Sequence, residues 1–401
     1  MQRLLRLMAE QQASDVYLSA HAPATIKING VCRPINDQPL PPEVPLNLLA
    51  EVASPHRVEE LKKTGELNLS VPIRGVGNFR ISAMRQRGTC ALVIRFISPE
   101  VPPLETLGLP AVLPRLIMEK RGLILIVGAT GVGKSTTLAA LLDYRNRNAP
   151  GHILTIEDPI EFVFTHRRSV INQREVGTDT ATLQIALKNA MRQAPDVIMI
   201  GEIRDRETMS AALAYAQAGQ LCLSTLHANN SYQALHRILS FYPVQARSTL
   251  LGDLASSLRG IVSQRLVRTV DGQRTPAAEV LLNTSLISEL IGKGDFSGIK
   301  EAIENALTEG SQTFEQDLAR LIRAGRVQQR EGLSHADSAT NLLWRLNNDG
   351  SRRAAPPAHE QHLPGHDAPA FTDITLDVPA TGFDQNLETP SPTGTAFDTR
   401  L

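Results

Sequence analysis

The stretch Leu123-Ile-Leu-Ile-Val-Gly-Ala-Thr-Gly-Val-Gly-Lys-Ser-Thr-Thr-Leu138 decides the fold. Its centre, Gly128–Ser135, matches G-x-x-x-x-G-K-[ST] at every fixed position, between an apolar strand pattern and a helical pattern. That context distinguishes a phosphate-binding loop from a chance match, because glycines let successive backbone N–H groups turn toward one anion at a helix N-terminus. The alternative, a glycine-rich turn that binds nothing, fits this context poorly. The sequence therefore predicts a nucleoside triphosphate site.

The predicted site uses ATP and Mg²⁺. Lys134 would reach the β- and γ-phosphates, and the Ser135 hydroxyl would ligate the metal. The candidate nucleotide-binding residues are Gly128, Ala129, Thr130, Gly131, Val132, Gly133, Lys134, Ser135 and Thr136.

Composition narrows the class of protein. At 401 residues the chain is long enough for two or three domains. Lys+Arg and Asp+Glu number 41 each, and this neutral balance argues against a protein whose main role is to grip nucleic acid. The three cysteines are scattered, which suits a reducing cytosol, and no apolar run approaches the ~18–20 residues that cross a bilayer. We expect a cytoplasmic protein without a transmembrane segment.

The sequence divides into four regions. Residues 1–97 predict a small α+β domain, 98–107 a proline-rich linker, and 108–349 an α/β domain with a helical C-terminal part. Residues 350–401 hold seven prolines and few large apolar side chains, which predicts a disordered tail. Three histidines in this tail could indicate a metal tract, although a solvated tail is the favoured interpretation; they are His359, His362 and His366.

Apolar patterns locate the main elements. In the small domain, strands are predicted at 15–19, 25–28, 31–35, 76–84 and 90–96, and the Asn29-Gly30 turn joins the second strand to the third. A loop is predicted at 39–45 and a helix at 55–67. The larger domain has buried strands at 123–127, 153–156, 197–200 and 221–226, with helices between them at 182–192 and 207–218. Such alternation is typical of a parallel sheet covered on both faces. Beyond residue 245 we expect mostly helix, with apolar stripes over 250–262 and 314–322.

Polar residues follow each of the four buried strands. Because ligands bind outside the carboxyl ends of parallel strands, these residues are expected to share one crevice with the phosphate loop. Glu202 ends a Walker B-like strand and could support the metal or polarise water. Glu157, Asp158 and Glu161 supply three carboxylates in five residues, and spacing alone leaves open which one faces the γ-phosphate. His227 could sense that phosphate, although a buried structural histidine is at least as consistent with the pattern.

Arg80 and Arg95 lie on predicted strands of the small domain. The strand pattern alone favours ordinary exposed arginines. An arginine that reaches the triphosphate from another domain or subunit would instead couple hydrolysis to movement.

Taken together, residues 14–346 resemble the PilT/PilU family, the retraction ATPases of type IV pili within the secretion-ATPase superfamily. The resemblance rests on four ordered boxes: the Walker A box at 128–135, the acidic box at 156–162, the Walker B box at 195–205 and the histidine box at 224–230. It implies a PAS-like N-terminal domain, a RecA-like ATPase domain, and a homo-oligomeric, hexameric ring with nucleotide between subunits. It also implies that Glu161 helps to activate water, that Glu202 supports metal and water, and that Arg80 and Arg95 are arginine fingers. The candidate metal ligands are Ser135, Glu202, Glu157 and Asp158.

Two details favour the accessory PilU branch. Leu226-His-Ala-Asn-Asn230 resembles the form of the histidine box in that branch, and Ser285-Leu-Ile-Ser-Glu-Leu-Ile291 replaces the A-I-R-N-L-I-R-E motif of PilT. One departure affects both branches, since Gln220 stands where the family usually has histidine. The resemblance implies a motor peripheral at the inner membrane that acts with a principal retraction ATPase and the membrane platform protein. The alternatives are a coupling subunit with slow turnover and a secretion or conjugation ATPase.

Overall fold

The structure is a computed structural model that describes residues 1–348 except 29, 74, 98–99 and 305–309. The predicted tail at 350–401, with its three histidines, lies outside the described residues. So do Asn29 of the predicted hairpin turn and the first two residues of the predicted linker.

The N-terminal residues form an antiparallel six-stranded sheet in the order β3-β2-β1-β6-β5-β4. Its strands are β1 Asp15–Ser19, β2 Pro23–Ile28, β3 Val31–Pro39, β4 Glu66–Ile73, β5 Gly77–Gln86 and β6 Thr89–Ile97; its helices are α1 Gln2–Glu10, α2 Val44–Ala50 and α3 Pro55–Thr64. Buried apolar side chains from the sheet and all three helices make one core. The predicted helix at 55–67 is too long: Gly65, at φ 84°, ends α3, and β4, which was not predicted, begins at Glu66.

The second sheet has seven strands in the order β13-β12-β7-β11-β10-β8-β9, parallel except for β13. The strands are β7 Gly122–Val127, β8 Gly151–Glu157, β9 Ser169–Glu175, β10 Val197–Glu202, β11 Leu221–Leu226, β12 Leu258–Arg268 and β13 Arg274–Leu282. All four predicted buried strands are present, and residues 123–127 of β7 are fully buried. The predicted α/β class with a parallel core is confirmed.

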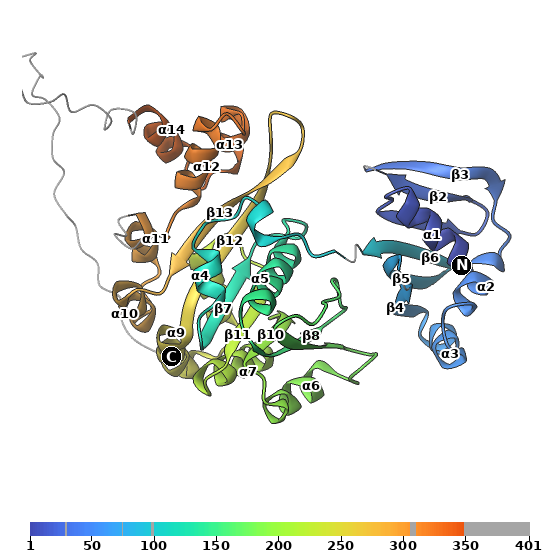
Figure 1. The fold of residues 1–401 in the computed structure, drawn as a ribbon, viewed down its shortest axis with the longest axis horizontal. Coiled ribbons are helices and arrows are strands. Elements are labelled where there is room, and N and C mark those ends of the chain that lie inside the picture. The colour runs from blue at the N-terminus through green and yellow to red at the C-terminus, as the bar shows by residue number, and fades with distance from the viewer. Residues whose placement is uncertain (29, 74, 98–99, 305–309, 349–401) are drawn as a thin grey trace, which may run out of the picture. The chain divides into compact units, whose positions relative to one another are not determined.

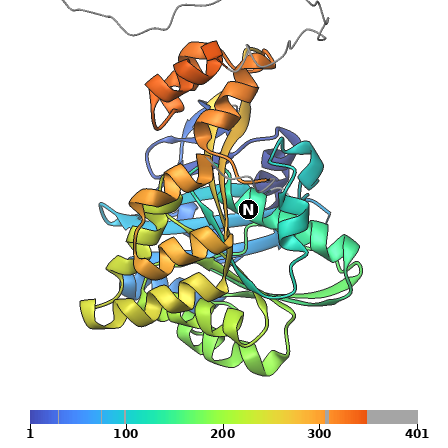
Figure 2. The same cartoon turned by 90° about the vertical axis from the view of Figure 1, so that its left-hand side faces the viewer.

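Helices cover both faces of this sheet (Figures 1 and 2). Alternate residues of β7 enter two different apolar clusters, one on each face. One face is covered by α4 Leu113–Ile117 and α5 Lys134–Asn148; the other by α6 Leu183–Ala190, α7 Arg206–Gln217, α8 Ser231–Ser240, α9 Arg247–Ser257, α10 Ser285–Lys293 and α11 Ser297–Glu304. A smaller cluster joins α12 Phe314–Arg323, α13 Gln329–His335 and α14 Ala339–Asn348 to β12 and β13.

The predicted helical stripe over 250–262 is wrong in its second half. Helix α9 ends at Ser257, and Leu258, Ile261 and Val262 belong to β12, which pairs with β7. A run that is apolar on both faces of a buried strand cannot be told from a buried helix by periodicity alone. The antiparallel neighbour β13 and the edge strand β9 were not predicted either.

Candidate active site

The phosphate loop joins β7 to α5 (Figure 1). Residues 128–133 form the turn, and Lys134, Ser135 and Thr136 form the first turn of α5. Gly131 and Gly133 have φ of 79° and 90°, a region that side-chain-bearing residues avoid. The backbone therefore takes the curvature that turns N–H groups toward an anion.

Lys134 is folded back over the loop. Its Nζ donates to the carbonyls of Gly128 at 2.9 Å and Ala129 at 2.8 Å, and it lies 3.5 Å from Nδ1 of His227. The residue is only 9% exposed. Burial lowers the pKa of this ammonium, and the carboxylates of Glu202 and Glu161 act in the opposite direction.

One cavity brings the polar strand ends together. It is lined by residues of the phosphate loop and by Glu157, Asp158, Glu161, Glu202, Arg204, Thr225 and His227. These residues lie at or just after the carboxyl ends of β8, β10 and β11, which follow one another on one side of β7 in the order β11-β10-β8. Strand order thus places the candidate residues of the ATPase domain in one crevice, as expected for a parallel sheet.

Glu202 lies at the end of β10 and is held on both carboxylate oxygens. Oε2 accepts from Nε of Arg204 at 2.7 Å, and Oε1 lies 3.1 Å from Nε2 of His227. A neutral imidazole with its proton on Nε2 satisfies both of its contacts, since it donates to Glu202 and accepts from Lys134. Arg204, Glu202, His227 and Lys134 therefore form a continuous polar chain across the site.

The three carboxylates of the acidic box lie in different environments. Asp158 and Glu161 are exposed, whereas Glu157 is 7% exposed and turned into the protein. Oε1 of Glu157 accepts from Thr155 Oγ1 at 2.6 Å and from Gln173 Nε2 at 3.2 Å. Burial raises the pKa of Glu157 to about 7 despite these hydrogen bonds.

The neighbouring strand β9 fixes the backbone of the acidic box. Gln173 donates to the carbonyl of Phe162 at 2.8 Å and accepts from the N–H of Phe164 at 2.9 Å. Glu175 accepts from the N–H of Ile160 at 3.0 Å. Sequence reasoning missed these supporting residues because it did not predict β9.

Arg80 and Arg95 are directly opposite each other on β5 and β6 of the small domain. Asp15 of β1 is the next partner in the row, and its Oδ1 accepts from Nε of Arg95 at 2.9 Å. Lys27 of β2 lies opposite Asp15. Like charges placed opposite each other in a sheet repel, so this row of three cations and one buried carboxylate suits binding of an anion.

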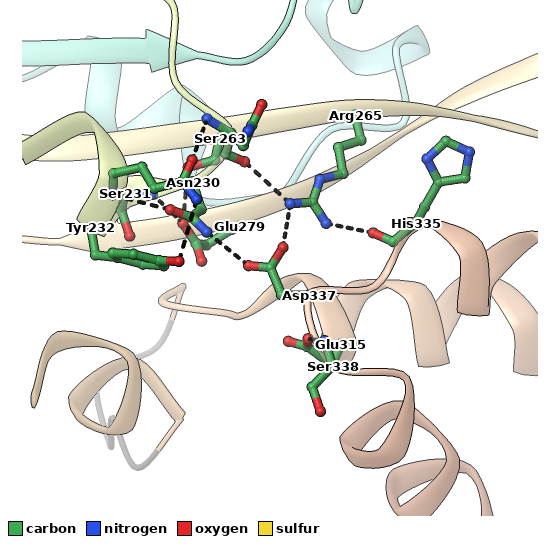
Figure 3. Close-up of polar contacts among 12 residues, drawn as sticks. Asn230, Ser231, Tyr232, Ser263, Arg265, Glu279, Glu315, His335, Asp337 and Ser338 are labelled. Carbon is green, nitrogen blue, oxygen red and sulfur yellow. Dashed lines mark hydrogen bonds and ion pairs between the residues drawn. The ribbon is translucent and has the colours of Figure 1, made fainter. Parts of the chain in front are cut away.

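The histidine box continues into a partly buried polar network that the sequence did not reveal (Figure 3). Asn230 donates to Asp337 at 3.0 Å, and Asp337 forms an ion pair with Arg265 of β12. Glu279 of β13 accepts from the N–H of Ser231 at 2.7 Å. Burial raises the pKa of Glu279, although hydrogen bonds from the serines of the network oppose that shift.

Comparison with known proteins assigns the chain to a family. The model for "Type II/IV secretion system protein" matches residues 1–320. The chain belongs to this family. The Pseudomonas aeruginosa "Type IV pilus ATPase PilU" is 46% identical over 380 residues, which cover 94% of this chain and 98% of the relative. The P. aeruginosa "Type IV pilus retractation ATPase PilT" is 36% identical over 339 residues, 84% of this chain and 98% of that protein.

A solved structure shares the fold. The "Crystal Structure of the Pilus Retraction Motor PilT and Bound ADP" superposes with a TM-score of 0.79 at 36% identity, covering 85% of this chain and 99% of that one. The predicted resemblance to the retraction-ATPase family is therefore confirmed. The chain is an ATPase of the family that includes the type IV pilus retraction motors, and it uses a nucleotide.

The site residues suit Mg²⁺ carried in with a nucleotide. Within the described residues, no group of three or more His, Cys, Asp or Glu is arranged to hold a metal by itself. Mg²⁺ commonly takes one or two protein ligands and completes its shell with phosphate oxygens and water. Ser135 and Glu202 offer such a small set, whereas Glu157 is already occupied inside the protein. None of the described helices combines the length and apolar character needed to cross a bilayer.

Proposed function

We propose that the chain hydrolyses MgATP in the cavity beside the phosphate loop. The observation that carries this proposal is the polar chain from Lys134 through His227 to Glu202, which faces the phosphate loop and the acidic box in one cavity. Bound phosphates would replace the loop carbonyls as partners of Lys134. Their negative charge would offset the burial that lowers the pKa of this ammonium.

Each residue then has a distinct role. The backbone N–H groups of residues 131–136 bind phosphate oxygens, and Lys134 binds the β- and γ-phosphates. Ser135 would be a ligand of Mg²⁺ and Glu202 would lie beside its hydration shell, where the metal would neutralise charge on the phosphates. Glu161 orients and activates the attacking water: its carboxylate is exposed, it lines the cavity, and its backbone N–H donates to Glu157 at the end of the acidic box.

We infer that hydrolysis is completed between subunits of a homo-oligomeric ring, with Arg80 and Arg95 supplied by the small domain. The row of cations on β2, β5 and β6 supports this role, because the single carboxylate of Asp15 cannot neutralise three cations. A triphosphate would supply the missing negative charge. By the boundaries proposed from the sequence, these arginines belong to the small domain at 1–97 and the phosphate loop belongs to the domain at 108–349.

The biological role that we propose is retraction of a type IV pilus, as an accessory ATPase at the inner membrane that acts with a principal retraction ATPase and a membrane platform protein. The 46% identity to a protein named PilU supports the pilus over a secretion substrate. The neutral net charge supports a protein substrate over nucleic acid.

The test compares the purified full-length protein with Glu161→Gln. Steady-state ATP turnover should fall by about 10²-fold or more, as for loss of a general base, while ADP binding persists. Glu119→Gln, at an exposed position before β7, is the matched control and should retain turnover. Unchanged turnover in Glu161→Gln would remove this residue from the mechanism.

A second assay separates the motor from the coupling subunit. Turnover is measured alone and with the principal retraction ATPase, and twitching is scored in a deletion strain complemented with each variant. A motor requires Glu161 for twitching. A coupling subunit would support twitching equally well with Glu161→Gln.

A further inference from the structure

The buried amide of Gln264 on β12 contacts the phosphate loop from the neighbouring strand. β12 pairs in parallel with β7 as far as Ser263 opposite Val127, and it continues beyond the end of β7. Gln264 therefore stands level with the first glycine of the loop. Its side chain is enclosed, since the residue is 3% exposed.

Both ends of this amide are used. Nε2 donates to the carbonyl of Val132 at 2.7 Å, and Oε1 accepts from Thr137 Oγ1 at 2.7 Å. One partner lies inside the phosphate loop and the other in the first turns of α5. Glutamate would place an acceptor against the Val132 carbonyl, and methionine would leave two buried polar groups unpaired.

The contact with Val132 orients the peptide that enters Gly133. In a trans peptide the carbonyl and the following N–H point in opposite directions. A Val132 carbonyl held toward β12 therefore turns the Gly133 N–H away from β12, and Gly133 lines the cavity. This N–H is one of the loop donors expected to bind phosphate.

The loop glycines are fitted around the same residue. A Cβ on Gly128 would lie 2.7 Å from the carbonyl oxygen of Gln264, and a Cβ on Gly133 would lie 3.0 Å from its Nε2. Two fixed glycines of the motif thus allow close approach to Gln264, in addition to their backbone angles.

We propose that Gln264 is a positioning residue for the phosphate loop, which sets the orientation of the loop donors through Val132 and Thr137 without touching the nucleotide. This inference rests on the proposed nucleotide site. It also assigns the two faces of β12 different tasks. Gln264 faces the phosphate loop, while Ser263 and Arg265 face the histidine box and the C-terminal helices, as Figure 3 shows.

The test measures MgADP affinity of the full-length protein by calorimetry. Gln264→Met keeps the volume and removes both hydrogen bonds, and we expect ADP binding about ten- to hundredfold weaker. Thr137→Val removes one partner and should weaken binding about two- to tenfold. The double variant should bind no worse than Gln264→Met, because the two changes remove a shared contact.

Gln312→Met is the matched control. Gln312 also donates to a backbone carbonyl, that of Ala278 at 2.8 Å, but away from the loop. It should lose stability without losing ADP affinity, whereas a purely structural role for Gln264 would make the two variants alike. Wild-type affinity in Gln264→Met overturns the proposal.

If Gln264→Met does not fold, the MgADP affinity of Thr137→Val becomes the deciding measurement. Wild-type affinity in Thr137→Val would also overturn the proposal. Failure of the wild-type protein to bind ADP would instead refute the nucleotide site itself.

Discussion

The stability that Glu157→Gln gains over the wild type should be larger at alkaline pH than at acidic pH. The carboxyl of Glu157 is buried, and burial raises its pKa from 4.5 to about 7. Between these two values the folded protein keeps a proton that the unfolded chain has already released. The free energy of unfolding of the wild type therefore falls as pH rises through this window.

The size of the effect follows from the two pKa values. For a single group with these values, the stability lost between about pH 5 and about pH 8 is roughly 2–3 kcal/mol. Glutamine does not titrate, and its carbonyl oxygen can still accept from Thr155 and Gln173, as Oε1 of Glu157 does. The variant should therefore lack this pH-dependent loss.

The assay is urea denaturation of both proteins, without nucleotide and with EDTA, at several values across that range. The difference in unfolding free energy between variant and wild type isolates Glu157, because all other titrating groups are shared. It should grow in favour of the variant as pH rises. A difference that is flat, or that grows in the opposite direction, would show that Glu157 is ionised in the folded protein throughout.

Two further changes test the arrangement around the site. Arg80→Gln and Glu161→Gln should each lack turnover alone, but a 1:1 mixture of exchanging subunits should recover about a quarter of wild-type turnover. About one site in four would then pair a wild-type Glu161 with a wild-type Arg80 from the neighbouring subunit. No recovery would refute catalysis between subunits. Asp337→Ala breaks the ion pair with Arg265, in which both side chains are about one-fifth exposed. It should cost about 2–3 kcal/mol in urea denaturation, whereas Glu289→Ala, in the exposed pair with Lys293, should be indistinguishable from wild type.

The sequence predicted the structure correctly where the residues needed for function also determine the local structure. The phosphate loop has fixed residues at fixed spacing, and the strands at 123–127, 153–156, 197–200 and 221–226 are short apolar runs that end in polar residues. In a parallel sheet the carboxyl ends of the strands lie at one edge, so the acidic box, Glu202 and His227 could be expected in one crevice.

What the sequence could not supply depends on contacts between distant segments. Gln264 can contact the phosphate loop only because β12 lies beside β7. The apolar pattern that precedes it, at Leu258, Ile261 and Val262, is equally consistent with a buried helix. The acidic box shows three equivalent carboxylates in sequence. Only the packing of β8 against β9 buries Glu157 and leaves Asp158 and Glu161 exposed.

The geometry of β12 also explains how the nucleotide site could communicate with the C-terminal helices. Successive strand residues point to opposite faces, so Gln264 holds the phosphate loop while Arg265 holds Asp337 at the start of the last helical segment. Asn230, three residues after His227, donates to the same Asp337. A nucleotide that draws Lys134 away from His227 therefore acts on the histidine box, and Asp337 joins both that box and β12 to the C-terminal helices. Coupling of this kind requires that these contacts differ between nucleotide states, and hydrogen exchange in α13 and α14 with and without ADP would measure that difference.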